Sequence, residues 1–99
     1  MSMRQLTVLA KVKAREGMED EVKQELLSLV SLTRLESGCI SYDLHQSKQD
    51  SSLYMFYENW ASEEYLKKHF SMSYLKNFMG KSEKMLAEPI EVTLWEKVS

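Results

Sequence analysis

The chain has 99 residues, of which 43% are hydrophobic and 28% are charged, and its formal net charge at pH 7 is −2. This length fits a single domain over residues 1–99, and the balanced composition excludes a disordered or collagen-like chain. Lysine and arginine are spread along the sequence without a basic cluster, so we expect no nucleic-acid partner and no anionic membrane surface.

Three further features of the sequence bear on the cellular location of the protein. No apolar run approaches the ~20 residues that a membrane-spanning helix requires. The N-terminus begins an alternating pattern instead of the apolar region of a secretory signal peptide. The single cysteine, Cys39, cannot form an internal disulfide. These features favour a cytoplasmic protein that does not act at a membrane.

The first half of the chain predicts a strand followed by a helix. Residues 5–14 alternate between apolar and polar side chains, as a half-buried strand does. Gly17 interrupts this pattern. Residues 18–36 then place apolar side chains at helical spacing, with acidic residues near the start, where they suit the helix dipole. Gly38 is the predicted stop of this helix.

The middle of the chain predicts a β-hairpin. Residues 39–46 and 53–60 are rich in aromatic and branched side chains, and the polar residues 47–52 form a turn between them. Along the second of these strands, apolar side chains occupy both alternating sets of positions. This strand therefore presents an apolar surface on each face.

The last third predicts helical segments and a final strand. Ser62 is a suitable N-cap for a helix, and a further helix restarts at Ser71 or Ser73 and continues until shortly before Pro89. Residues 90–98 form the last strand, again with apolar side chains on both faces.

The element order predicts the fold class. Strand, helix, strand, strand, helix, strand is the order of the ferredoxin-like β-α-β-β-α-β fold, an α+β architecture whose antiparallel sheet carries its helices on one face. A sheet that is apolar on both faces must be covered on both. Because one chain supplies helices for a single face, we expect a second copy to cover the other, which predicts a homodimer.

Several short motifs are spread over nearly the whole chain: Glu36-Ser37-Gly38-Cys39, Tyr42, Phe56-Tyr57-Glu58-Asn59-Trp60, Ser62-Glu63-Glu64, His69 and Phe78. Together they resemble the antibiotic biosynthesis monooxygenase (ABM) family, and most of all its small quinol-monooxygenase-like branch. The resemblance implies a dimeric α/β barrel in which each subunit has a pocket between its sheet and the second helical region. It also implies that the protein oxygenates a quinol or phenol with O2 and needs no cofactor.

Such chemistry requires an apolar pocket that binds an aromatic ring and a group that accepts its proton. His69 is the candidate acceptor, because histidine is the side chain whose reference pKa lies nearest neutrality. Tyr65 lies one helical turn before it, and Asn59 and Trp60 end the neighbouring strand, where they would orient and stack on a ring. We therefore interpret two residues as catalytic and four as substrate-binding: His69 and Asn59, and Trp60, Tyr65, Tyr74 and Phe78.

Tyr74 marks a difference from the family, which often has a second histidine at this position. Tyrosine donates a hydrogen bond but is a poor base near neutral pH, because its reference pKa is about 10. A two-histidine mechanism is therefore not expected. The haem-degrading branch uses a histidine in the later helical segment, and this chain has none after His69.

Two further features concern ionisable residues. The two histidines and the cysteine lack the spacing of metal ligands, so no metal site is expected. Glu58 lies between apolar neighbours on a strand. It is either paired across the dimer or a buried acid with a raised pKa, and pairing is the favoured interpretation.

The leading functional interpretation is a cofactor-independent monooxygenase, an oxidoreductase, acting on a small quinol or electron-rich aromatic. Two alternatives remain. The first is a non-catalytic stress-response dimer that binds a small apolar molecule, which the seven methionines would suit. The second is an isomerase of a small carbonyl compound that uses His69 as its base.

Overall fold

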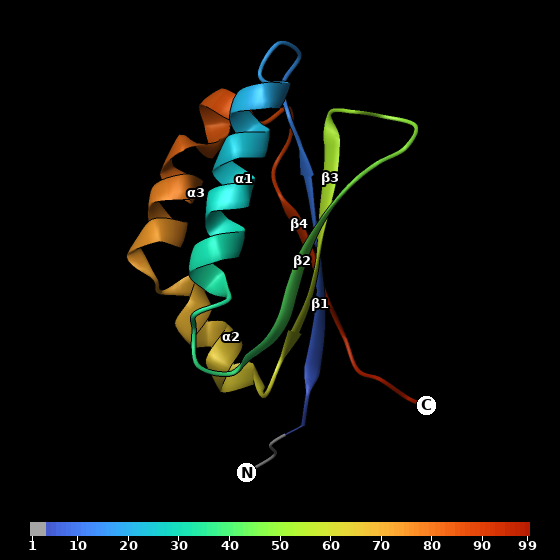
Figure 1. Ribbon diagram of the computed structural model, residues 1–99, viewed down its shortest axis with the longest axis vertical. Coiled ribbons are helices and arrows are strands. Elements are labelled where there is room, and N and C mark those ends of the chain that lie inside the picture. Colours follow the sequence, from blue (N-terminus) through green and yellow to red (C-terminus); the bar gives the residue numbers. More distant parts are fainter. Residues whose placement is uncertain (1–3) are drawn as a thin grey trace.

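The computed structural model describes residues 4–99, so the first three residues of the predicted domain lie outside the described range. Within this range the chain forms an α+β structure with one four-stranded antiparallel sheet and three helices (Figure 1). In chain order the elements are β1 (Leu6–Lys13), α1 (Glu19–Thr33), β2 (Cys39–Gln46), β3 (Leu53–Trp60), α2 (Glu63–Phe70), α3 (Ser73–Met85) and β4 (Glu91–Trp95). The predicted ferredoxin-like fold class is confirmed.

The strand order in the sheet is β2-β3-β1-β4, and every neighbouring pair is antiparallel. All three helices lie on one face of this sheet, and the opposite face is open (Figure 1). Val8 of β1 pairs with Glu58 of β3 and with Leu94 of β4. Because side chains alternate along a strand, this register assigns each strand position to the helix-covered face or the open face.

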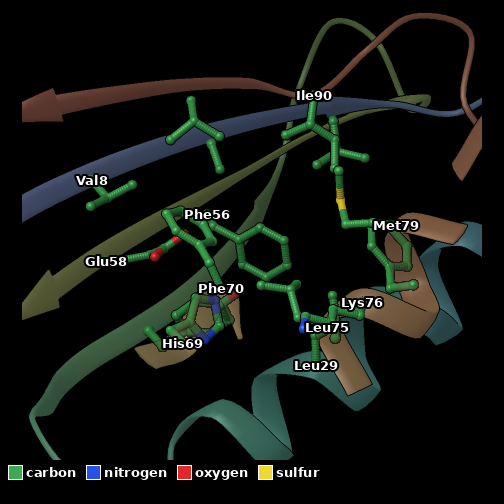
Figure 2. A pocket seen from close by; sticks show the side chains of 15 residues that line it. Val8, Leu29, Phe56, Glu58, His69, Phe70, Leu75, Lys76, Met79 and Ile90 are labelled. Atoms are coloured by element: carbon green, nitrogen blue, oxygen red, sulfur yellow. The ribbon is translucent and has the colours of Figure 1, made fainter. Parts of the chain in front are cut away.

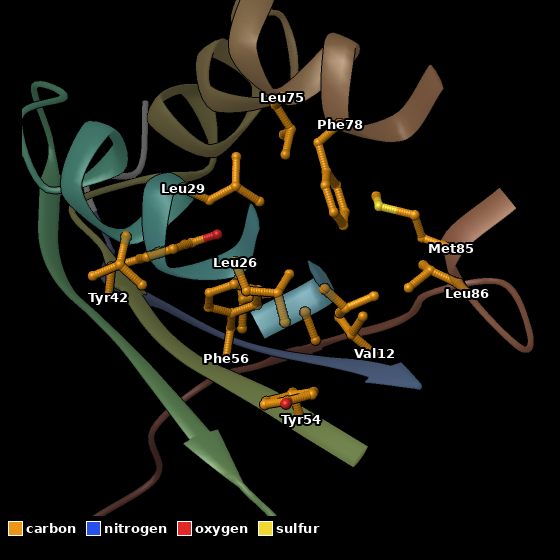
Figure 3. Packing of buried hydrophobic residues seen from close by; sticks show 14 of the residues in the cluster. Val12, Leu26, Leu29, Tyr42, Tyr54, Phe56, Leu75, Phe78, Met85 and Leu86 are labelled. Carbon is orange, nitrogen blue, oxygen red and sulfur yellow. The ribbon is translucent and has the colours of Figure 1, made fainter. Parts of the chain in front are cut away.

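The core lies between the helices and the sheet. Its most deeply buried large side chains, each under 2% exposed, include Trp60 and Tyr54 of β3 and Leu26 of α1. Figure 3 shows Leu26 packed toward the sheet beside Phe56, with Phe78 of α3 above them. Complete burial of each such side chain stabilises the fold by roughly 1.5–3 kcal/mol.

Two predicted elements are longer than the observed ones. The helix predicted over 18–36 ends at Thr33, after which Glu36 N–H bonds to the Thr33 carbonyl in a tighter turn. The strand predicted over 90–98 is limited to β4, because Trp95 already pairs with Thr7 near the start of β1. Beyond Trp95 the pairing with β1 ends, since only Leu6 of that strand remains. The helix restart is at Ser73, one of the two predicted positions.

The open face of the sheet carries several apolar side chains, as predicted. Tyr57 of β3 and Trp95 of β4 are 41% and 53% exposed. The register places both on the face opposite the helices, since their partners Leu9 and Thr7 also point there. The predicted homodimer would cover this face. Across residues 4–99, none of the helices has the length and apolar character needed to cross a membrane.

Candidate active site

An apolar cavity of about 360 Å³ lies between the helix-covered face of the sheet and α3 (Figure 2). This volume is within the range of small-molecule sites. Side chains from all four strands line one side, and Leu29 of α1 with Leu75, Phe78 and Met79 of α3 line the other. The resemblance implied a pocket at this place, between the sheet and the second helical region.

His69 brings a titratable ring to the wall of this cavity. It lies in the last turn of α2, where it shares the buried stripe with Leu66 three residues earlier. Its ring centroid lies 4.8 Å from that of Trp60 and 5.6 Å from that of Tyr42. These aromatic contacts hold the imidazole in one orientation.

Glu36 fixes the protonation pattern of that imidazole. Its Oε2 lies 2.8 Å from Nδ1 of His69, and the two side chains are only 5% and 3% exposed. An ionised carboxylate only accepts hydrogen bonds, so Nδ1 carries the proton and Nε2 of the neutral ring keeps a free lone pair. Nε2 has no hydrogen-bond partner within residues 4–99. This nitrogen is therefore available to accept a proton from a ligand.

Tyr74 donates its hydroxyl hydrogen to the same Oε2 of Glu36. Burial, reinforced by the adjacent Glu36 carboxylate, raises the pKa of Tyr74 above its ordinary value. Burial also raises the pKa of Tyr42, whose ring lines the cavity. Both phenols consequently stay protonated near neutral pH and act as hydrogen-bond donors, which leaves His69 as the base of this group.

The loop after α1 positions Glu36. Gly38 has a φ of +81°, a left-handed conformation that glycine adopts without strain. The ring of Tyr65 lies so close to Gly38 that a Cβ atom there would overlap it. The Gly38 carbonyl also accepts a 2.8 Å hydrogen bond from the Ala61 N–H at the end of β3. These contacts fasten the loop to α2 and direct Glu36 toward His69.

Glu58 is the second carboxyl group at the cavity. It is 4% exposed and lies on the helix-covered face of β3, where its Oε1 accepts a 2.9 Å hydrogen bond from the indole N–H of Trp60. Burial raises the pKa of Glu58 to about 7; the Trp60 hydrogen bond opposes this shift, and the Glu36 carboxylate adds to it. The favoured pairing of Glu58 across a dimer is therefore corrected: this side chain is a buried acid inside one subunit, facing away from the open face.

The structure brings some of the predicted site residues together. His69 and Phe78 line the cavity. Trp60 packs against the His69 ring and bonds to Glu58, but it is not part of the cavity wall. Tyr74 is connected to the site by its hydrogen bond to Glu36. Tyr65 packs against Gly38, in the loop that carries Glu36. Of the four predicted substrate-binding residues, Phe78 thus forms part of the cavity wall. The other three contact residues that surround the cavity.

Asn59 is the exception, because its side chain lies on the open face of the sheet. Its Oδ1 accepts hydrogen bonds from Thr7 Oγ1 at 2.7 Å and from Gln5 Nε2 at 3.2 Å. Its Nδ2 donates to Ser41 Oγ at 3.0 Å. The structure therefore does not bring Asn59 together with His69, and the predicted substrate-orienting role has no counterpart in the cavity wall.

Two residues of the site were not among the site residues that the sequence predicted. Glu36 stood there only as part of a motif, since nothing in its spacing connects it to His69, which lies thirty-three residues later in the sequence. Glu58 carried a usable signal, because it shares the alternation of the buried Phe56 and Trp60. In the described part of the chain, no group of three or more His, Cys, Asp and Glu side chains is arranged to hold a metal ion.

Comparisons with known proteins show which family and which solved structures the chain resembles. The family model described as antibiotic biosynthesis monooxygenase matches residues 5–81. The Bacillus subtilis protein named "Putative monooxygenase YcnE" is 26% identical over 91 residues, which cover 92% of this chain and 96% of that protein. The crystal structure of PA3566 from Pseudomonas aeruginosa has a TM-score of 0.92 at 29% identity and covers 100% of both chains.

A longer relative is also similar in sequence. The Synechocystis protein sll1783 is 26% identical over 91 residues, or 92% of this chain. The matched segment spans only 62% of the length of that protein. The shared fold unit therefore occurs within a larger chain in this relative.

Proposed function

Because the chain belongs to the antibiotic biosynthesis monooxygenase family, we propose that it is a cofactor-independent monooxygenase acting on a small quinol or a similar electron-rich aromatic. The family supports a monooxygenase-like function. The observation that carries the finer proposal is the buried Glu36–His69 pair at the wall of an apolar cavity. This arrangement provides one directed proton acceptor in a space suited to an aromatic ring.

The reaction begins when Nε2 of His69 accepts a proton from a quinol hydroxyl. The negative charge of Glu36 stabilises the imidazolium that forms. The resulting quinolate transfers an electron to O2, and recombination of the two radicals forms a bond between oxygen and a ring carbon. Cleavage of the O–O bond then leaves one oxygen atom on the ring and releases the other as water.

The overall change is balanced without an added reductant. The quinol supplies four electrons in becoming a hydroxyquinone, and these reduce both atoms of O2. The protein's contribution is to bind the ring, hold the proton and exclude water. The apolar side chains around His69, such as Phe56 and Phe78, serve the last purpose.

We propose in addition that the active protein is a homodimer formed through the open face of the sheet. Tyr57 and Trp95 expose apolar surface there. A second copy would bury this surface while leaving the cavity, on the opposite side of the sheet, within each subunit. The proposed partners are therefore a second copy of the chain and a small aromatic molecule.

The test is O2 uptake by the purified protein with a panel of reduced benzoquinones and naphthoquinones, with catalase present and with buffer as the autoxidation control. Replacing His69→Ala removes the proposed base, and His45→Ala is the matched control because His45 is exposed on β2. We expect uptake above autoxidation in the wild type and the control, and a loss of about 100-fold or more in His69→Ala.

Other outcomes would point elsewhere. Equal uptake by His69→Ala would contradict the role of His69. Saturable quinol binding without any O2 uptake would support the ligand-binding alternative. Proton exchange on a small carbonyl compound without O2 would support the isomerase.

A further inference from the structure

The polar groups of the cavity are concentrated at one end. Figure 2 shows Glu58 and His69 together, and Ile90 and Met79 at the other end. The sheet register agrees, because Glu58 lies opposite Val8, whereas Ile90 adjoins the Glu91–Lys11 pair further along β1. A ligand in this cavity therefore meets Glu58 and His69 at one end and mostly apolar side chains elsewhere, with Lys76 of α3 as the further charged residue of the wall.

The Glu58 carboxyl group has one oxygen left for a ligand. Its Oε1 is occupied by the Trp60 indole N–H at 2.9 Å. Its Oε2 accepts no hydrogen bond from any residue within 4–99, although the side chain is 4% exposed. Within residues 4–99, Thr33 Oγ1 is the only fully buried side-chain polar atom without a hydrogen-bond partner. Glu58 Oε2 therefore retains accessible surface, where a ligand in the cavity that Glu58 lines can donate a hydrogen bond to it.

The ionisable neighbours of Glu58 come from several elements of the fold. The ionisable groups that face it or the same cavity are His69 from α2, Tyr42 from β2 and Lys76 from α3, together with the Glu36 carboxylate from the loop after α1. Glu58 forms no salt bridge with any of them in the part of the chain that the structure describes. The Trp60 hydrogen bond holds the carboxyl group through Oε1 and leaves Oε2 free to accept a hydrogen bond, in a side chain that lines the cavity.

We propose that Glu58 is a second anchoring residue for the substrate, so that the cavity selects aromatic molecules with two hydroxyl groups, one bound by Nε2 of His69 and one by Oε2 of Glu58. This inference rests on the proposed function for the aromatic nature of the ligand, but it does not require turnover. It gives the site a basis for distinguishing a quinol from a simple phenol, because a site built to bond a hydroxyl group rejects an analogue that lacks it.

The test compares two ligands in the absence of O2, so that no reaction occurs. Naphthohydroquinone carries both hydroxyl groups, and its monomethyl ether carries one. Calorimetric titration gives the dissociation constant of each. The titration is run at about pH 8, because the pKa of Glu58 is about 7 and its carboxyl group is mostly ionised above that pH. A hydrogen bond to a charged group contributes enough for the wild type to bind the diol about 10- to 100-fold more tightly than the ether.

Two variants of Glu58 test whether this side chain causes the difference in affinity between the diol and the ether. Glu58→Leu removes the anchor, and we expect it to bind both ligands with nearly equal affinity. Glu58→Gln keeps an acceptor for the Trp60 N–H and folds more readily. We expect its ratio to fall about 3- to 10-fold, because an amide NH2 donor replaces the Oε2 acceptor and the charge is lost. The exposed Glu64→Gln is the control and retains the wild-type ratio.

Equal affinity of the wild type for the two ligands would overturn the proposal, as would an unchanged ratio in Glu58→Gln. The two proposals fail separately. Selective diol binding without O2 uptake contradicts the monooxygenase proposal alone, and O2 uptake without diol selectivity contradicts the anchoring proposal alone.

Discussion

Glu36 Oε2 lies 2.8 Å from His69 Nδ1, and this contact joins the loop after α1 to the last turn of α2. Both side chains are nearly inaccessible to solvent. In such surroundings a charge-assisted hydrogen bond is stronger than at the surface and determines which ring nitrogen carries the proton. With Nδ1 bonded to Glu36, Nε2 of the buried His69 is the nitrogen that can act as a base toward a ligand in the cavity.

The first prediction concerns the charge of Glu36. Glu36→Gln keeps an acceptor for the Nδ1 proton but removes the negative charge that stabilises the imidazolium. We expect kcat for O2 uptake to fall about 10- to 100-fold with little change in KM. The reason is that the attraction between the Glu36 carboxylate and the imidazolium arises only when His69 accepts the proton, after the substrate has bound. Steady-state kinetics at neutral pH measure this. The exposed Glu63→Gln is the control, and a wild-type kcat in Glu36→Gln would contradict the prediction.

The second prediction concerns the pH dependence of stability. Burial raises the pKa of Glu58 from its usual 4.5 to about 7 in the folded state. A carboxyl group that binds its proton more tightly when folded stabilises the fold at low pH, and this contribution is lost as the pH rises through about 7. From about pH 5 to about pH 8, the free energy of unfolding should fall by roughly 2–3 kcal/mol more in the wild type than in Glu58→Gln.

Denaturant titrations at several pH values and one fixed protein concentration measure this difference. All other ionisable groups are common to the two proteins, so their contributions to the pH dependence cancel to first order. Parallel stability curves for the two proteins would show that Glu58 titrates normally in the fold.

The third prediction concerns the loop that carries Glu36. Gly17 and Gly38 both have positive φ angles, of 89° and 81°, but only Gly38 has neighbours in the space of a Cβ atom. Gly17→Ala should cost about 1–2 kcal/mol through backbone conformation alone. Gly38→Ala should cost a further 1–3 kcal/mol or so, because the methyl group overlaps the Tyr65 ring.

Chemical denaturation of the two variants separates these contributions. Equal losses of stability would show that the packing of Tyr65 on Gly38 is looser than described. A larger loss in Gly38→Ala, accompanied by reduced O2 uptake, would support the role of this loop in placing Glu36.

The fourth prediction concerns the open face of the sheet. Tyr57→Lys puts a charge in the centre of the proposed dimer surface, and Leu35→Lys changes a side chain that is 83% exposed in the loop after α1. Sedimentation velocity at micromolar concentration should show a dimer for the wild type and for Leu35→Lys, and a monomer for Tyr57→Lys. A wild-type protein that sediments as a monomer would contradict the dimer proposal.

Much of the fold could be predicted because local patterns determine it. The hairpin strands have the predicted bounds, Cys39–Gln46 and Leu53–Trp60, since a polar turn separates two clearly apolar segments. The end of α1 was harder, because residues 34–36 continue the helix through tighter turns that leave no change in the sequence pattern.

The site could be predicted only in part. His69 stood out as a histidine in an aromatic segment, but its partner Glu36 comes near it only when the loop after α1 packs against α2. Asn59 and Trp60 are adjacent in sequence, and strand alternation places adjacent side chains on opposite faces. The sequence prediction placed them in one site because they are neighbours along the chain, whereas the sheet places their side chains on opposite faces.

The most direct test of the central claim is the fate of the oxygen atoms. The protein is incubated with a reduced naphthoquinone under ¹⁸O₂, and the product is analysed by mass spectrometry beside a protein-free sample and His69→Ala. The account predicts a hydroxyquinone that contains one ¹⁸O atom and forms much faster with the wild type than with either control. Product without the label, or labelled product that forms equally fast with His69→Ala, would contradict it.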